Sequence, residues 1–445
     1  MTFGHPARLA LSFALPLMLG NIAQQLYTIT DAAIIGQFAG IEAFSALGSA
    51  EWMVWMVFGV ISSVMQGFGI PMAQLFGAGD LRHLRRTVRT AALIALIIAL
   101  GYTALGLSTA LPLLRLLGTI ENLRSRALTY LMIVISGTLF TTIYNLSATV
   151  LRALGNSRAP LIAMAVSSVM NIVLDLLFVW GFKWSIAGAA AATVFSQLAA
   201  SLVCLWQVRK LDILKSDDDE KAAERFSRKD AGTLLRLAAP MALQSVLIGL
   251  GGMALQSVIN SLGESFVAGF SAGNKLYGVL EMAAVAFGMA VVTYTGQNLG
   301  AKQFSRIRLG IRWFAPLGVL MSLVITAIMF IFGRDFLRLF IEKGAPEDAM
   351  KVAVRYIRTM AASLSTLYLL YIYRSALQGI GNTFIPMVSG LAECVARVGM
   401  AVLLTHTVGS SGIYWVETAA WSAAMILLII AWYIKQRQLE SLKLQ

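Results

Sequence analysis

Long runs of apolar residues alternate with short polar segments along the whole 445-residue chain. A helix needs ~20 mostly apolar residues to cross the ~30 Å hydrocarbon core of a membrane. By this criterion the pattern predicts about twelve transmembrane helices, six in each half. In the first half they cover residues 10–35, 50–76, 91–113, 128–151, 159–181 and 186–208. In the second half they cover residues 233–260, 273–299, 311–333, 352–379, 384–406 and 414–434.

The composition points to the same class of protein. Hydrophobic residues make up 58% of the chain and charged residues 13%, which is unlike a soluble domain. We therefore expect an all-α integral membrane protein. A cleavable signal peptide is the alternative for the first apolar run. However, Pro16, Asn21 and Gln24 follow without a small-residue cleavage pattern, and the run continues past Asp31, so we expect a retained first helix.

Basic residues outnumber acidic ones, 35 to 22, and give a net charge of +13. Most of this surplus lies in alternate loops, in residues 81–89, 152–158, 209–229 and 302–312, and in the tail from residue 435. The positive-inside rule predicts that these loops and both termini are cytoplasmic, in a cytoplasmic (inner) membrane. Nucleic-acid binding is not expected, because the charges are spread through short loops instead of forming a basic domain.

Three local similarities indicate that the chain is a duplicated half. LRALGNSRAP at 151–160 resembles LQGIGNTFIP at 377–386, and QLFGAG at 74–79 resembles QNLGAK at 297–302. The prolines Pro16 and Pro240 are separated by almost the same shift along the chain as these two pairs of segments. We expect an N-lobe at 1–208, a cytoplasmic linker at 209–232 and a C-lobe at 233–445. Parallel repeats of this kind place substrate and ion sites near the middle of the membrane.

Two carboxylates lie inside predicted helices of the first half. Burying a charged group at the middle of a membrane costs at least ~2.5 kcal/mol, so Asp31 and Asp175 are functional candidates. Asn171 precedes Asp175 by four residues and shares its helix face, and Ser167 extends that face by one turn. Carboxylate, amide and hydroxyl oxygens suit a small hard cation or a proton. The structural alternative is a hydrogen-bonded pair that holds helices together.

Asp31 has its own polar stripe, because Tyr27 and Gln24 lie four and seven residues before it. If both stripes face one cavity, Asp31 and Asp175 approach each other. One of two neighbouring buried carboxylates would then hold a proton or bind a sodium ion.

The second half carries different charged residues. Glu281 lies within the eighth predicted helix, and Glu393 and Arg397 lie four residues apart in the eleventh, where an ion pair is expected. By the shift that relates 151–160 to 377–386, Arg397 replaces Asn171, and no carboxylate is kept at the place of Asp175. Glu281 and Glu393 either contact a cationic substrate, carry a second proton, or form structural ion pairs with Lys275 or Arg397.

Several catalytic motifs are absent from the sequence. It has no GxxxxGK[ST] phosphate loop and no HExxH, and its three histidines are scattered. The two cysteines, Cys204 and Cys394, lie in separate apolar runs and are expected to be packing residues. We therefore expect neither an enzyme nor an ATP-driven pump, and no cofactor. A channel is a further alternative, but no selectivity filter is recognisable.

Four segments resemble the multidrug and toxic compound extrusion (MATE) family, within the multidrug, oligosaccharidyl-lipid and polysaccharide exporters. They are PLMLGNIAQQLYTITDAAIIGQFAG at 16–40, MQGFGIPMAQLFGAG at 65–79, LRALGNSRAPLIAMAVSSVMNIVLD at 151–175 and GAAAATVFSQ at 188–197. The resemblance implies two six-helix lobes around a V-shaped cavity. It also implies exchange of Na⁺ or H⁺ for amphipathic, often cationic compounds.

The resemblance further implies an N-lobe site for the coupling cation. Carried over by motif, its residues are Asp31, Asn171, Asp175 and Thr193, which would bind Na⁺ directly in a sodium-coupled protein. Asn145 matches a polar position of the fourth helix. The remaining candidates for the substrate cavity are Gln24, Tyr27, Asn145, Glu281, Glu393 and Arg397.

The expected function is therefore secondary active multidrug efflux by alternating access. We expect the protein to act as a monomer in the lipid bilayer on small molecules. The alternative within the same superfamily is a flippase for lipid-linked oligosaccharide or polysaccharide, which would need a cavity rich in Arg and Lys. Few cations lie within the predicted helices of the first half.

Overall fold

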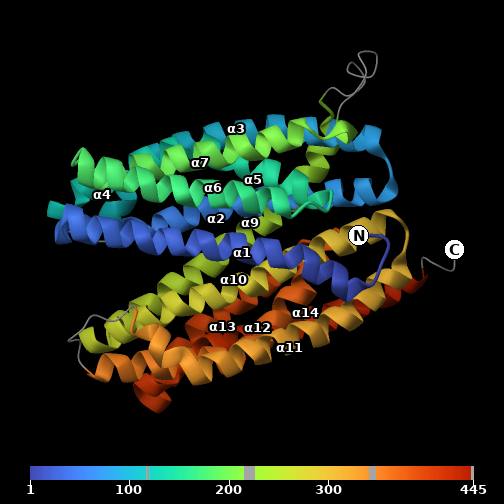
Figure 1. Ribbon diagram of the computed structural model, residues 1–445. Helices are drawn as coiled ribbons and strands as arrows, with labels where there is room; N and C mark the ends of the chain where they lie inside the picture. The colour runs from blue at the N-terminus through green and yellow to red at the C-terminus, as the bar shows by residue number, and fades with distance from the viewer. Residues whose placement is uncertain (117–118, 120, 215–225, 340–346, 442–445) are drawn as a thin grey trace. The chain divides into compact units, whose positions relative to one another are not determined.

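The computed structural model describes residues 1–445 except 117–118, 120, 215–225, 340–346 and 442–445 (Figure 1). The first half forms helices α1 (Pro6–Ile34), α2 (Ile41–Ala78), α3 (Leu81–Leu116), α4 (Glu121–Ser136), α5 (Thr138–Ala153), α6 (Arg158–Asp175) and α7 (Ser185–Arg209). The second half forms α9 (Arg228–Asn260), α10 (Glu264–Gly300), α11 (Phe304–Leu337), α12 (Glu347–Gly379), α13 (Phe384–Val408) and α14 (Ile413–Ser441). Short π and 3₁₀ segments are η1 (Ile35–Ala39), η2 (Leu176–Gly181), η3 (Asp212–Leu214) and η4 (Gly409–Gly412).

Every apolar run that was predicted to span the membrane is helical in the structure. Within the described residues, nine helical stretches are long and apolar enough to cross a membrane, and α4 with α5 adds a tenth. One of the nine, Phe384–Gln438, contains both α13 and α14 and so covers two predicted spans. The prediction of an all-α integral membrane protein is confirmed.

The fourth predicted span, 128–151, is not one straight helix. It is divided into α4 and α5, which meet at Gly137 with a bend of 44°. A Cβ atom at Gly137 would lie 2.6 Å from Cγ2 of Val194 on α7, so the bend brings the α4–α5 junction against α7. Membrane helices tolerate such breaks where neighbouring helices satisfy the freed backbone groups.

The chain forms two compact units. The first unit is Leu19–Ala242, and the second unit is Met1–Met18 together with Leu243–Gln445. The boundaries fall within α1 and α9, so each of these helices contributes residues to both units. The lobe boundaries expected from the sequence, 1–208 and 233–445, remain a prediction. Part of the expected linker, residues 215–225, lies outside the described residues.

In the second unit, α10 packs closely on α12. A Cβ atom at Gly269 would lie 2.3 Å from the Ala349 carbonyl oxygen, and one at Gly273 would lie 2.6 Å from the Tyr356 ring. Two small residues four positions apart let membrane helices approach each other. This close packing brings Tyr356 of α12 beside Asn274 of α10, whose Oδ1 accepts a hydrogen bond from the Tyr356 hydroxyl at 3.2 Å.

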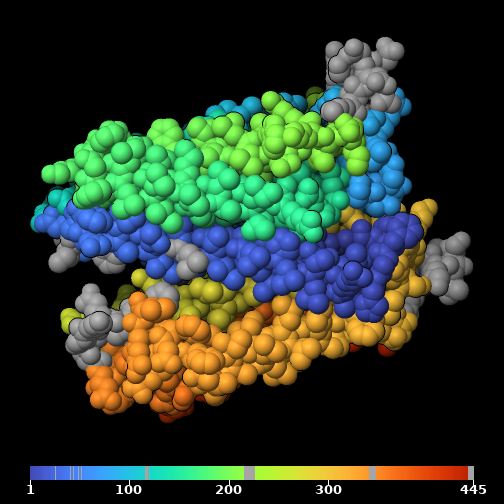
Figure 2. Space-filling view, viewed as in Figure 1, coloured from blue at the N-terminus to red at the C-terminus, as the bar shows by residue number. Residues whose placement is uncertain are grey.

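In the first unit, α6 and α7 lie side by side along the face shown in Figure 2 (green). The outer face of α6 is apolar, since Val169 and Val173 are 65% and 57% exposed. A membrane helix turns such a face to lipid and its polar residues inward. The polar residues of α6 between Ser167 and Asp175 are accordingly buried.

Candidate functional site

The buried face of α6 carries three polar residues one turn apart. Ser167, Asn171 and Asp175 are at most 1% exposed. On α1, Tyr27 and Asp31 are likewise one turn apart and are 8% and 6% exposed. The sequence predicted both stripes from their four-residue spacing, and the fold buries both within the first unit.

The two stripes meet at their carboxylates. The side chains of Asp31 and Asp175 are in polar contact with each other. Tyr130 of α4 lies near both of them and contacts Thr193 of α7. Tyr27 contacts Gln197, which lies one turn after Thr193. Four helices, α1, α4, α6 and α7, therefore converge on the same small polar region.

Several oxygens in this region have no hydrogen-bond donor of normal geometry among the described residues. They are Oδ1 of Asp31, Oδ1 of Asn171, both carboxylate oxygens of Asp175 and Oε1 of Gln197. Leaving a buried acceptor unsatisfied costs roughly 1–3 kcal/mol, and more for a charged group. A proton or a small cation would satisfy these oxygens and relieve the repulsion between the two carboxylates.

The ligand types also bear on which ion the site can take. The described residues contain no group of three His, Cys, Asp or Glu side chains that could hold a metal ion. Two carboxylates with amide and hydroxyl oxygens form a hard-oxygen set, which does not suit zinc or copper. The set fits a proton or a hard monovalent cation such as Na⁺.

The structure thus brings Asp31, Asn171, Asp175 and Thr193 into one region, while their roles remain a prediction. Gln24 is exposed and contacts Tyr27 at the edge of the region. Asn145 donates to the Thr141 carbonyl oxygen of its own helix at 2.9 Å, and no contact links it to the carboxylates.

Sequence reasoning assigned no role to two residues of this region, Tyr130 and Gln197. Gln197 lies four residues after Thr193, so the same spacing argument that linked Asn171 to Asp175 could have found it. Tyr130 offered no such signal, because a single tyrosine in a membrane helix is most often a packing residue.

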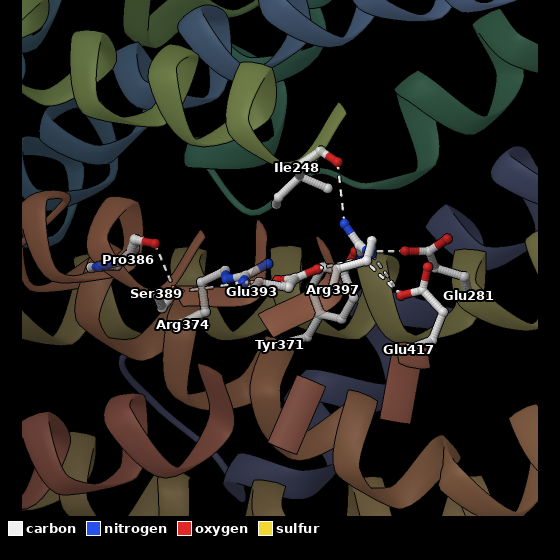
Figure 3. A network of polar contacts seen from close by, with 9 residues as sticks. All are labelled: Ile248, Glu281, Tyr371, Arg374, Pro386, Ser389, Glu393, Arg397 and Glu417. Atoms are coloured by element: carbon white, nitrogen blue, oxygen red, sulfur yellow. Dashed lines mark hydrogen bonds and ion pairs between the residues drawn. The ribbon is translucent and has the colours of Figure 1, made fainter. Parts of the chain in front are cut away.

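In the second unit, charged residues form a second polar network (Figure 3). The expected ion pair between Arg397 and Glu393 is confirmed, with Nη2 and Oε1 3.0 Å apart. Arg374 holds the other oxygen of Glu393 at 2.8 Å, and Glu417 accepts from Arg397 at 2.8 Å. The sequence did not predict the last two contacts, because Arg374 and Glu417 lie on α12 and α14, far from Glu393 along the chain.

Glu281 stands apart from these ion pairs. Among the described residues it pairs with neither Lys275 nor Arg397, and its Oε1 accepts a hydrogen bond from the Tyr371 hydroxyl at 3.0 Å (Figure 3). The structural ion pair considered for Glu281 is therefore not formed.

Membrane-length helices with apolar outer faces, together with a buried site of unsatisfied oxygens, are the features of a membrane transporter. The MatE family model matches residues 16–177 and again 240–403. The chain belongs to the MatE family, a family of transporters and not of enzymes. Because the same model matches both halves, at nearly the shift that relates the local similarities, the duplication predicted from the sequence is confirmed.

Relatives of similar length support this placement. The probable multidrug resistance protein YpnP of Bacillus subtilis is 30% identical over 93% of this chain and 91% of its own. The probable multidrug resistance protein NorM of Thermotoga maritima is 25% identical over 88% of this chain and 84% of its own. A protein of Shewanella oneidensis named FAD transporter is also 25% identical, over 98% and 96%.

Solved structures show the same fold. A crystal structure of MATE in complex with MaL6 aligns with a TM-score of 0.91 at 20% identity and covers 98% of both chains. A transporter of the MOP superfamily from Pyrococcus furiosus aligns with a TM-score of 0.91 at 21% identity, over 98% of this chain and 97% of its own. At these identities the likeness establishes the fold alone.

Proposed function

We propose that the protein is a secondary active multidrug efflux antiporter. It exchanges Na⁺ or H⁺, bound at Asp31 and Asp175, for amphipathic and often cationic organic compounds. The observation that carries the proposal is the pair of buried carboxylates whose oxygens lack donors within the described residues. The names of the relatives YpnP and NorM, both probable multidrug resistance proteins, support the substrate class.

The coupling follows from charge. An ion that neutralises the carboxylates changes the relative free energies of the two access states, because it binds them with different affinity. Asn171, Thr193, Tyr130 and Gln197 supply neutral polar atoms around the ion. One elementary charge moved through 100 mV releases ~2.3 kcal/mol, before any concentration gradient is added. Neither ATP nor a cofactor is required.

The test is efflux of a fluorescent organic cation from proteoliposomes under an imposed sodium gradient, and separately under a pH gradient. For Asp175→Asn we expect gradient-driven efflux to fall at least about tenfold, because the neutral amide cannot take up a proton or balance the charge of a bound cation. The control is Glu121→Gln, the same chemical change at a side chain that is 90% exposed. A folded Asp175→Asn variant that still couples efflux to either gradient would rule out the site.

A second candidate substrate is a flavin dinucleotide. The observation in its favour is the relative named FAD transporter, which matches along nearly the whole chain. FAD should be tested in the same efflux assay, since its fluorescence allows the amount released from the vesicles to be measured. Efflux of FAD without efflux of the organic cation would replace the substrate class and leave the ion site as proposed.

We also propose a location in the cytoplasmic (inner) membrane with both termini in the cytoplasm. The support for this orientation is the series of basic loops along the sequence, which alternates with loops that carry a smaller excess of basic residues.

A further inference from the structure

Arg397 of α13 is held from three sides within the second unit. Its Nη2 donates to Glu393 at 3.0 Å and to Glu417 at 2.8 Å, and its Nε donates to Glu417 at 3.1 Å. Its Nη1 donates to the Ile248 carbonyl oxygen of α9 at 3.2 Å. The side chains of Arg397 and Glu393 are each 5% exposed, and that of Glu417 is 15% exposed. Figure 3 shows the guanidinium lying between the two carboxylates.

A close helix contact fixes which positions of the two halves correspond. In the first half, a Cβ atom at Gly188 would lie 3.0 Å from the backbone carbon of Phe178. In the second half, a Cβ atom at Gly412 would lie 2.7 Å from the carbonyl oxygen of Leu404. Gly188 and Gly412 lie 224 positions apart, as do residues 16 and 240, where the two family-model matches begin. Phe178 and Leu404 lie 226 positions apart, as do residues 177 and 403, where the two matches end.

Counted from these contacts, the α6 and α7 residues of the candidate ion site correspond to residues of α13 and α14. Asn171 precedes Phe178 by seven residues, as Arg397 precedes Leu404. Thr193 follows Gly188 by five residues, as Glu417 follows Gly412. By the same count Glu393 corresponds to Ser167 and Ala401 to Asp175. The Arg397 network is therefore the C-terminal counterpart of the candidate ion site.

The two counterparts differ in how their polar atoms are satisfied. Among the described residues, both side-chain polar atoms of Asn171 and both carboxylate oxygens of Asp175 lack partners. At the corresponding place in the second half, the Arg397 guanidinium already provides positive charge and donors. Gly251 leaves space for it, since a Cβ atom there would lie 3.0 Å from Nη1.

We propose that Arg397 is a resident counter-ion whose guanidinium occupies the place that a coupling ion takes in the first half. It thereby confines ion coupling to the N-terminal half. This inference rests on the proposed ion site at Asp31 and Asp175. Because Arg374 neutralises the second oxygen of Glu393, the charges of the two arginines balance those of Glu393 and Glu417.

Removal of the guanidinium should open a latent cation site. Arg397→Asn installs the residue type found at the corresponding position of the first half, Asn171. In this variant Arg374 still pairs with Glu393, whereas Glu417 loses its cationic partner. Among the described residues, Glu281 and Tyr277 of α10 and Tyr356 of α12 also lie near Glu417, and none of the three supplies positive charge. Glu417 then needs a proton or a bound cation to remain buried.

The test is thermal melting of the purified full chain, titrated with NaCl at pH 8 and with acid in the absence of Na⁺. All variants carry Asp175→Asn, so that the first-half site does not contribute. Asp175→Asn alone should respond little to Na⁺ or acid. Addition of Arg397→Asn should lower the melting temperature by several degrees at pH 8 without Na⁺, and Na⁺ or acid should restore it. Further addition of Glu417→Gln should abolish this response.

Two results would overturn the inference. One is a folded Asp175→Asn/Arg397→Asn variant that responds no more than Asp175→Asn alone, and the other is a response that survives Glu417→Gln. If Arg397→Asn cannot be purified, Arg397→Lys keeps the charge and must show no added response. A wild-type response to Na⁺ or acid that is unchanged by Asp175→Asn would instead refute the proposed ion site on which the inference rests, and this result is distinguishable because it is obtained before Arg397 is changed.

Discussion

At the scale of single residues, the Tyr130 hydroxyl is a neutral polar group beside the candidate ion site. Tyr130 lies near Asp31 and Asp175 and contacts Thr193, so it orients oxygens that would bind the ion. Replacement by Phe keeps the ring, which is 5% exposed, and removes only the hydroxyl. We expect the ion concentration for half-maximal thermal stabilisation to rise about three- to tenfold, the effect of one lost hydrogen bond.

The matched control for Tyr130→Phe is Tyr102→Phe. Tyr102 of α3 packs against a buried apolar cluster that includes Ile61, Met65 and Ile94. Its replacement should leave the ion titration unchanged. An equal change in both variants would mean that the loss at Tyr130 reflects general packing and not the ion site.

The chemistry of each side chain decided which residues of the two polar sites could be identified from the sequence. Asp31 and Asp175 stood out because a carboxylate in an apolar helix is costly, and Asn171 followed from its position one turn away. Thr193 came only from the family resemblance. Glu417 was missed because it lies near the start of the last apolar run, where a carboxylate signals nothing without its partner Arg397.

At the scale of helices, the contact of α7 with η2, the π-helical continuation of α6, sets the geometry of the site. Gly188 lies five residues before Thr193, and Phe178 lies three residues after Asp175. Gly188→Ala places a Cβ atom 3.0 Å from the backbone and side chain of Phe178, so α7 and η2 must move apart. We expect a loss of about 1–3 kcal/mol in the free energy of unfolding, as for other overpacked contacts.

The same substitution should weaken ion binding, since it moves Thr193 relative to Asp175. Both effects are measured in one experiment, as the melting temperature and its dependence on ion concentration. Gly101→Ala is the control, because a Cβ atom at Gly101 of α3 meets nothing within 4 Å. That variant should be neutral or more stable by up to about 1 kcal/mol. A Gly188→Ala protein as stable as Gly101→Ala would show that the α6–α7 contact is not tight.

Hydropathy predicted where helices lie but not how they bend. The division of the fourth span at Gly137 escaped detection because apolar residues continue on both sides of it. The break is visible only as a tertiary contact, in which the missing side chain of Gly137 admits Val194 of α7. The short π segments η1 and η2, which follow Ile34 and Asp175, likewise carry no distinct sequence pattern.

At the scale of the whole molecule, duplication made the architecture predictable, although the two halves carry different polar residues at corresponding positions. Repeated loop motifs and prolines sufficed to infer two homologous halves, and the family model matches both. The local repeats aligned Arg397 with Asn171, but they did not reveal that a second charged residue stands at the place of Thr193. Glu417 in place of Thr193 became evident only when the Gly188 and Gly412 contacts aligned the two halves.

Orientation in the membrane is the remaining prediction at this scale. The segment 81–89 contains four arginines, whereas η4, Gly409–Gly412, has no charged residue. Lys and Arg are retained on the cytoplasmic side during insertion, so these two segments should lie on opposite sides. In a Cys204→Ala/Cys394→Ala background, a membrane-impermeant maleimide should label Ser410→Cys in intact cells. It should label Asp80→Cys, next to the arginines, only after the membrane is permeabilised. The opposite labelling pattern would invert the topology and place both termini outside the cell.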